Sequence, residues 1–150
     1  MLRQRFTETL KEAMKGKDEL AVSTTRLIIA KLKEQDIEAR GKGKESLADA
    51  EIQQMLQGMI KQRRESITLY EQGKRPELAE KERGEIAIIE RFLPQQMGDA
   101  ALEAAAKAII AELDATGIKD MGRTMAALRQ RHAGEIDGAK ASQIVKRLLS

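Results

Sequence analysis

The sequence contains no cysteine, only two prolines in 150 residues, and only three aromatic side chains, Phe6, Tyr70 and Phe92. The absence of cysteine excludes disulfides, thiolate nucleophiles and thiolate-ligated zinc or iron–sulfur sites. No stretch approaches about 20 consecutive apolar residues, so we expect no membrane-spanning helix and no membrane partner. The first residues also lack the apolar run of a signal peptide. These features favour a cytoplasmic protein.

Hydrophobic residues make up 41% of the chain, which is enough for a core. With so few rings, that core must consist of leucine, isoleucine, methionine and alanine, residues that favour helices and helix packing. Charged residues make up 34%, and the net charge is +3. This mildly basic balance permits a nucleic-acid partner without requiring one.

Apolar residues recur at helical spacing along nearly the whole chain, which predicts an all-α fold. In the first stretch, from about Leu2 to Lys15, they recur every four residues, at Leu2, Phe6, Leu10 and Met14. Breaks at 41–44, at Gly73 and at 94–98 separate the predicted helices. We therefore predict a four-helix unit at 1–93, a hinge at 94–98 and a three-helix domain at 99–150. Aspartates are expected to cap four of the helices: Asp18, Asp99, Asp120 and Asp137.

Two motifs that suggest chemistry are incomplete. The run from Gly41 to Ser46 has the glycines and lysines of a phosphate loop, but Glu38 stands where that motif needs its first glycine. His132 is the only histidine and has no serine or acidic constellation in the sequence, so a catalytic triad is not supported. With one histidine and no cysteine, a transition-metal site would need carboxylates alone. We predict no catalytic residues, metal site or cofactor.

Three charged residues fall on apolar helix faces. Arg63 lies between Ile60 and Ile67 in helical projection, while Glu82 and Glu85 lie among apolar residues of the next predicted helix. A buried charge is costly unless it is paired, so we predict an Arg63 ion pair with one or both carboxylates. The pair either fixes the packing of two helices or forms an acid/base or metal-binding site; the first alternative is favoured.

Other cations fall on outward helix faces. Lys61 and Arg64 share a stripe of the third predicted helix, Lys140 and Arg147 share one of the last, and Arg123 projects opposite Met125. Such stripes are typical of a solvated helix surface. They are also candidates for phosphate contacts with a folded RNA, whereas base stacking is not expected because no aromatic residue accompanies them.

Several short motifs, in order and spacing, are shared with one known family. They are Ile60 to Ile67 (IKQRRESI), Arg75 to Glu82 (RPELAEKE), Glu85-Ile86, Phe92 to Pro94, Asp120 to Met125 (DMGRTM), Gly134 and Asp137-Gly138. On these residues the chain resembles the GatB/YqeY-domain proteins, specifically the free-standing YqeY-like family. The resemblance implies an all-helical fold with a small C-terminal helical domain.

The resemblance also implies a relation to the tail of the B subunit of glutamine-dependent tRNA amidotransferases, matched here by about 99–150. In that enzyme the tail helps to hold tRNA, and the catalytic domains are absent from this chain. One departure stands at Glu135, where the family pattern usually has a basic or small residue.

Three functions remain open. The leading hypothesis is a non-catalytic helical module that binds tRNA, with an amidotransferase or another translation-related protein as a possible partner. The alternatives are a subunit or relative of a glutamine-dependent carbon–nitrogen ligase, and a protein-interaction adaptor. A carbon–nitrogen ligase label would be inherited from the amidotransferase relation.

Overall fold

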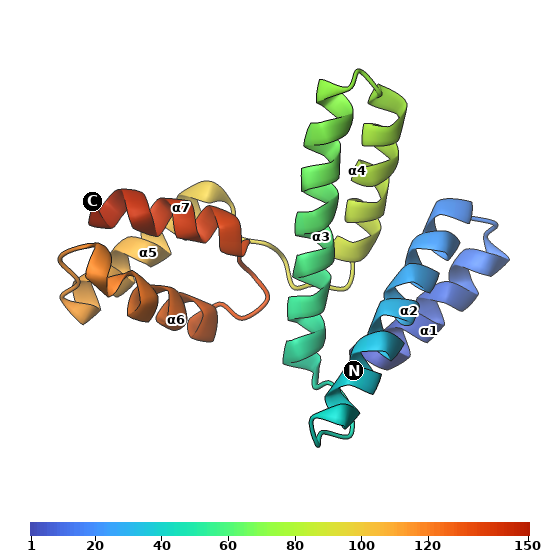
Figure 1. Ribbon diagram of the computed structural model, residues 1–150, viewed down its shortest axis with the longest axis horizontal. Coiled ribbons are helices and arrows are strands. Elements are labelled where there is room, and N and C mark those ends of the chain that lie inside the picture. The colour runs from blue at the N-terminus through green and yellow to red at the C-terminus, as the bar shows by residue number, and fades with distance from the viewer. The chain divides into compact units, whose positions relative to one another are not determined.

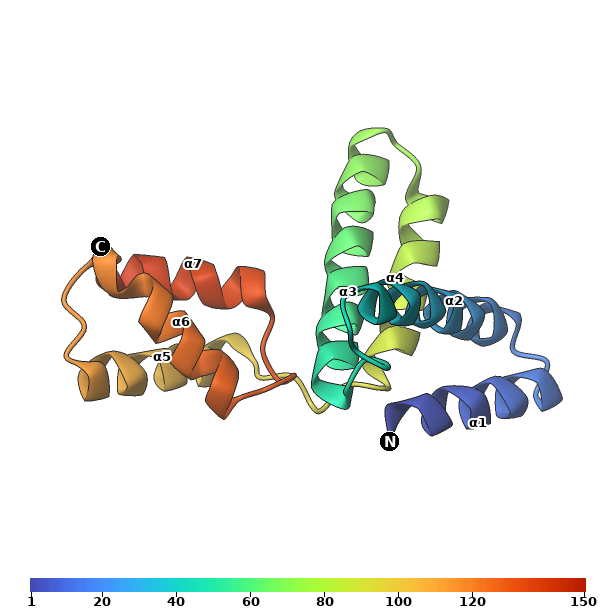
Figure 2. The same ribbon diagram turned by 60° about the horizontal axis from the view of Figure 1, so that its bottom comes forward.

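The computed structural model describes residues 1–150 and is helical throughout, without strands, which confirms the predicted fold class (Figures 1 and 2). The chain divides into two compact units, Met1–Leu93 and Pro94–Ser150. The first unit contains α1 (Leu2–Lys15), α2 (Glu19–Gly41), α3 (Asp49–Gln72) and α4 (Pro76–Glu90). The second contains α5 (Asp99–Leu113), the short 3₁₀ helix η1 (Ile118–Asp120), α6 (Met121–Arg131) and α7 (Gly138–Leu149).

The N-terminal unit is built from two helical hairpins, α1–α2 and α3–α4, that pack together mainly through α2 and α4. Its core is aliphatic, as the composition predicts, except where Phe6 of α1 meets Phe92 edge-to-face at 4.8 Å between ring centres. Gly84 lets α4 approach α2 closely, because a Cβ there would lie 2.6 Å from a terminal methyl group of Leu20. The first hairpin is thereby held against the second.

The apolar stripe predicted for α1 turns out to be only partly correct. Leu2 and Phe6 are buried, but Met14 is 52% exposed, and Ala13 is buried instead. A four-residue repeat drifts by about 40° per step against the 3.6-residue helical turn. Three steps from Leu2 therefore carry Met14 away from the core, while Ala13 returns to it.

The C-terminal unit packs α5, α6 and α7 around its own aliphatic core. The predicted hinge residues lie within this unit rather than beside it. The Met97 backbone N–H donates to the Glu135 carbonyl at 2.8 Å, and the Gln96 side chain donates to the carbonyls of Pro94 and Gly134. The segment before α5 is thus fastened to the loop between α6 and α7.

Two of the four predicted aspartate caps form. Asp18 accepts a hydrogen bond from the Ala21 N–H, and Asp137 accepts from the Ala139 and Lys140 N–H groups. The prediction at Asp99 was wrong, and the prediction at Asp120 was correct in position but not in hydrogen bonding. Gly98 is the N-terminal boundary residue of α5, so Asp99 already lies inside the helix. Asp120 ends η1 and is the N-terminal boundary residue of α6, but its side chain does not cap α6 and instead accepts from the Thr116 N–H.

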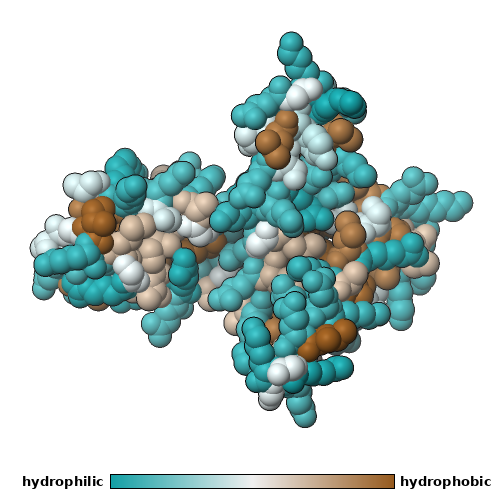
Figure 3. Space-filling view, in the orientation of Figure 1, coloured by the Kyte–Doolittle hydropathy of each residue, from teal (hydrophilic) through white to brown (hydrophobic).

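No helix is both long enough and apolar enough to cross a bilayer. On the face shown in Figure 3, hydrophilic atoms predominate and the apolar atoms lie in small separate groups.

Candidate functional site

No group of three or more histidine, aspartate or glutamate side chains is placed to hold a metal ion. The loop that resembles a phosphate loop lines an open depression between Arg40 and Ser46. Two cations here contact other protein groups: the Lys44 ammonium lies 3.0 Å from the Glu51 carboxylate, and Arg40 Nε donates to the Glu45 carbonyl. The Lys44 side chain is 59% exposed, so its pair with Glu51 is a surface contact between this loop and α3.

Arg63 and Glu85 form a largely buried ion pair between α3 and α4. The Arg63 Nε donates to the Glu85 carboxylate at 2.8 Å, and Nη1 donates to the Met59 carbonyl one turn earlier. The side chains are only 12% and 9% exposed. This geometry cross-links the two helices of the hairpin.

Glu82 lies one turn before Glu85 on α4 and is half-buried. Burial, and secondarily the charge of Glu85, raise the pKa of Glu82 although the Arg63 charge opposes this shift. No salt bridge joins Arg63 to Glu82, so the pair predicted with one or both carboxylates is made with Glu85.

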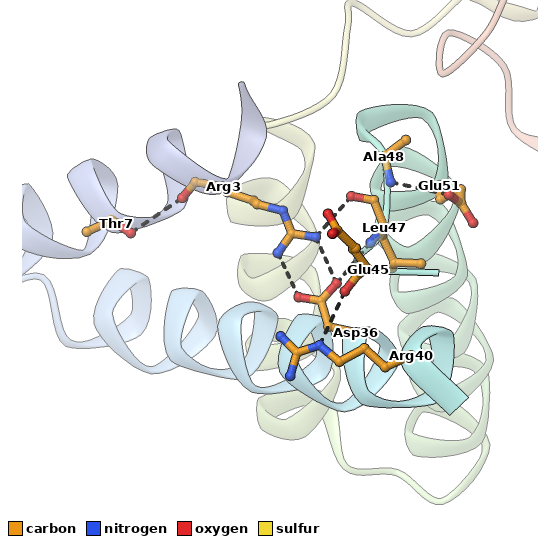
Figure 4. A network of polar contacts seen from close by, with 8 residues as sticks. All are labelled: Arg3, Thr7, Asp36, Arg40, Glu45, Leu47, Ala48 and Glu51. Carbon is orange, nitrogen blue, oxygen red and sulfur yellow. Dashed lines mark hydrogen bonds and ion pairs between the residues drawn. The ribbon is translucent and has the colours of Figure 1, made fainter. Parts of the chain in front are cut away.

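A second buried carboxylate, which the sequence analysis missed, ties α1 to α2 and to the start of α3. Both oxygens of Asp36 accept hydrogen bonds from the Arg3 guanidinium, at 2.7 and 2.8 Å, and one also accepts from the Leu47 N–H (Figure 4). Arg3 in turn donates to the Leu47 carbonyl. These contacts, the Arg3 bonds above all, lower the pKa of Asp36 to about 2. A signal was present, because Asp36 lies one turn beyond Leu32 on the apolar face of α2.

Three cations and two carboxylates line the edge where α5 and α7 pack. Lys140 Nζ lies 3.3 Å from Asp99, and Arg147 lies 3.0 Å from Glu103. Glu103 also holds Lys107 at 3.6 Å. We refer to these five residues as the α5–α7 edge. Two of the predicted RNA-binding residues, Lys140 and Arg147, are thus brought together with acidic partners that sequence spacing did not identify.

The remaining predicted RNA-binding residues lie elsewhere. Arg123, at the start of α6, is half-exposed and donates from Nε to Asp120 at 3.1 Å. The hydrogen bond from the Thr116 N–H is the largest contribution to a lowered pKa of Asp120. Lys61 and Arg64 belong to the other unit; both are exposed, and Arg64 lies 3.8 Å from Glu90.

His132 follows the last residue of α6 and faces the loop that leads to α7. Its Nδ1 lies 3.3 Å from the Glu135 carboxylate. The Glu135 backbone carbonyl is the acceptor for Met97 described above. His132 therefore contacts the residue through which this loop is hydrogen-bonded to the segment before α5.

The family model described as Yqey-like protein matches residues 3–149, which is nearly the entire chain. The chain belongs to the Yqey-like protein family. Apart from Leu2, the first residue of α1, all of its helices lie within the matched range, so both compact units are part of the family fold.

Curated relatives of this Yqey-like protein carry the name "Altered inheritance of mitochondria protein 41, mitochondrial". The protein from Lachancea thermotolerans is 35% identical over 86 residues, covering 57% of this chain and 44% of the relative. Those from Saccharomyces cerevisiae strain YJM789 and from Candida glabrata are 34% and 35% identical over 86 residues, with 45% and 46% of the relatives covered. The chain thus matches less than half the length of these relatives. Their name places them in mitochondria, and the cytoplasmic location expected here stays a prediction.

Within the Yqey-like chain, Glu135 stands where the family pattern is expected to have a basic or small residue. Its carboxylate contacts His132, so the negative charge takes part in the local structure of the α6–α7 loop. The N-terminus of α7 is likewise occupied, because the Asp137 carboxylate accepts from its first N–H groups. An anion at the N-terminus of α7 would therefore compete with the Asp137 carboxylate for these N–H groups.

Proposed function

We propose that this Yqey-like protein is a non-catalytic helical module that contacts the backbone of a folded tRNA through residues 94–150. The observation that supports this proposal best is the α5–α7 edge, where Lys107, Lys140 and Arg147 project from two packed helices as one group. Arg123 adds a fourth half-exposed cation from the same unit. Cations fixed on rigid helices are suited to phosphate contacts, which position a nucleic acid without reading its bases.

The resemblance to the tail of the amidotransferase B subunit supports the choice of tRNA over other nucleic acids. In that enzyme the tail holds tRNA while other domains carry out the chemistry, and a free-standing module would do the same for a separate partner. We propose an amidotransferase or another translation-related protein as that partner. Since the module brings few cations, we expect modest affinity with strong salt dependence.

The test is a titration of labelled tRNA with the full chain at low and moderate salt. The wild type is compared with an Arg123→Ala/Lys140→Ala/Arg147→Ala variant. If about three phosphates are neutralised, log K should fall against log salt with a slope of roughly −2 to −3. The variant should bind weakly and lose most of this slope.

A charge-matched control is available in the other unit. Lys11, Arg26 and Lys33 are exposed residues of α1 and α2, and replacing all three by alanine removes the same three charges. This control should bind tRNA nearly as well as the wild type. If the two triple variants bind equally, or if the wild type does not bind, the tRNA proposal fails and the adaptor alternative replaces it.

The ligase alternative needs a separate measurement. The protein, alone and mixed with a candidate amidotransferase, is assayed for amide formation on glutamyl-tRNA with glutamine as the amido donor. We expect no product from the chain alone. Product formed by the chain alone would instead make it an enzyme.

A further inference from the structure

We propose that Asp99 and Glu103 limit RNA binding at the α5–α7 edge, because they compete with phosphate for the cations that would hold it. This inference rests on the proposed tRNA binding and adds to it a determinant of affinity. On this proposal the two carboxylates set the affinity of the surface for RNA rather than stabilise the fold.

The geometry places one carboxylate between two cations. Glu103 lies 3.0 Å from Arg147 on the neighbouring helix and 3.6 Å from Lys107 one turn along its own helix. Asp99 lies 3.3 Å from Lys140, and Lys140 precedes Arg147 by two turns of α7. The five side chains therefore carry three positive and two negative charges, and most of the positive charge is neutralised locally.

The pairs are weak enough to be displaced. The side chains of Lys107, Lys140 and Arg147 are 63%, 55% and 61% exposed. An exposed ion pair contributes little to stability. The need to break it lowers the affinity for a competing anion by no more than about fivefold. A polyanion that brings several phosphates at once can therefore replace Asp99 and Glu103, but each carboxylate lowers the affinity because it remains close to the incoming phosphate.

The α5–α6 edge provides an internal comparison. There Glu112 of α5 forms an ion pair with Arg131 of α6, also between exposed side chains of adjacent helices. That edge has one cation and one carboxylate, whereas the α5–α7 edge has an excess of cations. Removing a carboxylate from either edge changes the net charge by the same amount, but only the α5–α7 edge would release two cations from one substitution.

The experiment measures tRNA affinity of full-length Glu103→Gln, Asp99→Asn and Glu112→Gln proteins at several salt concentrations. Releasing one cation adds about one phosphate contact, which makes the salt slope steeper by roughly one. Over a fourfold range of salt, such a contact changes the affinity about threefold. We expect Glu103→Gln to bind about 3- to 10-fold more tightly at low salt. The salt slope should become steeper by no more than about one, because Lys107 is the one released cation that is not already among the three expected phosphate contacts.

Asp99→Asn should show a smaller increase in affinity, because it releases Lys140 alone. Glu112→Gln should change the affinity for tRNA by less than about twofold, and Glu103→Gln/Arg147→Ala should lose most of the gain.

Equal gains for Glu103→Gln and Glu112→Gln would mean that only net charge matters, which overturns this inference while leaving tRNA binding intact. Weaker binding by Glu103→Gln would overturn it as well, since Glu103 would then hold Arg147 in a productive position. If neither the wild type nor any variant binds tRNA, the proposed function itself fails.

Discussion

The two compact units differ in the burial of their most prominent ion pairs. In the N-terminal unit, Arg63–Glu85 and Arg3–Asp36 tie helices together around carboxylate side chains that are 9% and 11% exposed. In the C-terminal unit, the pairs at Glu103 and Asp99 lie on the surface between half-exposed side chains. Buried charges depend on their partners for stability, whereas exposed charges lose little when a partner is exchanged. The first unit also has exposed pairs, such as Arg64–Glu90, so the difference between the units is the pair of buried carboxylates in the first.

The largest expected effect tests the buried pair in the first unit. Arg63→Ala leaves Glu85 buried without its cation, and breaking such a pair typically costs about 3 to 5 kcal/mol of unfolding free energy. Urea unfolding followed by Tyr70 fluorescence measures this, because the only tyrosine lies in this unit and the chain has no tryptophan. Arg64→Ala, at the exposed neighbouring position, is the control and should change stability by less than about 1 kcal/mol. Equal effects of the two substitutions would contradict a structural role for Arg63.

The second prediction concerns the pH dependence of the Arg3–Asp36 pair. The pKa of Asp36 is lowered to about 2 from an ordinary value of 3.8, so its contribution is present above about pH 4 and is lost as the pH falls toward 2. Allowing for solvent screening at the partly exposed Arg3, this contribution is about 1 to 2 kcal/mol.

Asp36→Asn provides the matched protein for this measurement. It should be less stable than the wild type at pH 7, and the two unfolding free energies should converge as the pH approaches 2. Urea unfolding at a series of pH values, again followed by Tyr70, tests this. A constant difference between the two proteins from pH 7 to pH 2 would show that the charge of Asp36 is not what stabilises the unit.

The smallest expected effect tests the surface pairs of the second unit. Arg147→Ala should change the unfolding free energy of this unit by no more than about 0.5 kcal/mol, since its guanidinium is 61% exposed. Asp137→Ala removes the cap of α7 and should cost about 1 kcal/mol. Amide hydrogen exchange in α7 compares the two variants, because this unit has no aromatic reporter. A larger loss for Arg147→Ala than for Asp137→Ala would make the α5–α7 edge a structural element and remove the contrast between the units.

Much of the candidate site depended on positions that helical projection can identify. Arg63 and Glu85 interrupt apolar faces, so the sequence marked them as buried charges that need partners. The same reasoning applies to Asp36, but its partner Arg3 lies 33 residues away in the sequence. Arg3 is on α1, whose buried face was predicted from a four-residue repeat that did not include it. The acidic partners of Lys140 and Arg147 were not identified, because surface positions carry no hydrophobic signal that relates one helix to another.

The sequence by itself determined that the chain is helical, and it placed the breaks near Gly41, Gly73 and Pro94, because helix periodicity and turn chemistry are local properties. It also determined the aliphatic nature of both cores. Only the tertiary structure decided which helices pack together, that Asp120 accepts from Thr116 rather than capping α6, and that Glu103 lies between Lys107 and Arg147. These outcomes depend on contacts between residues distant in sequence, and local propensity does not specify how helix faces are matched.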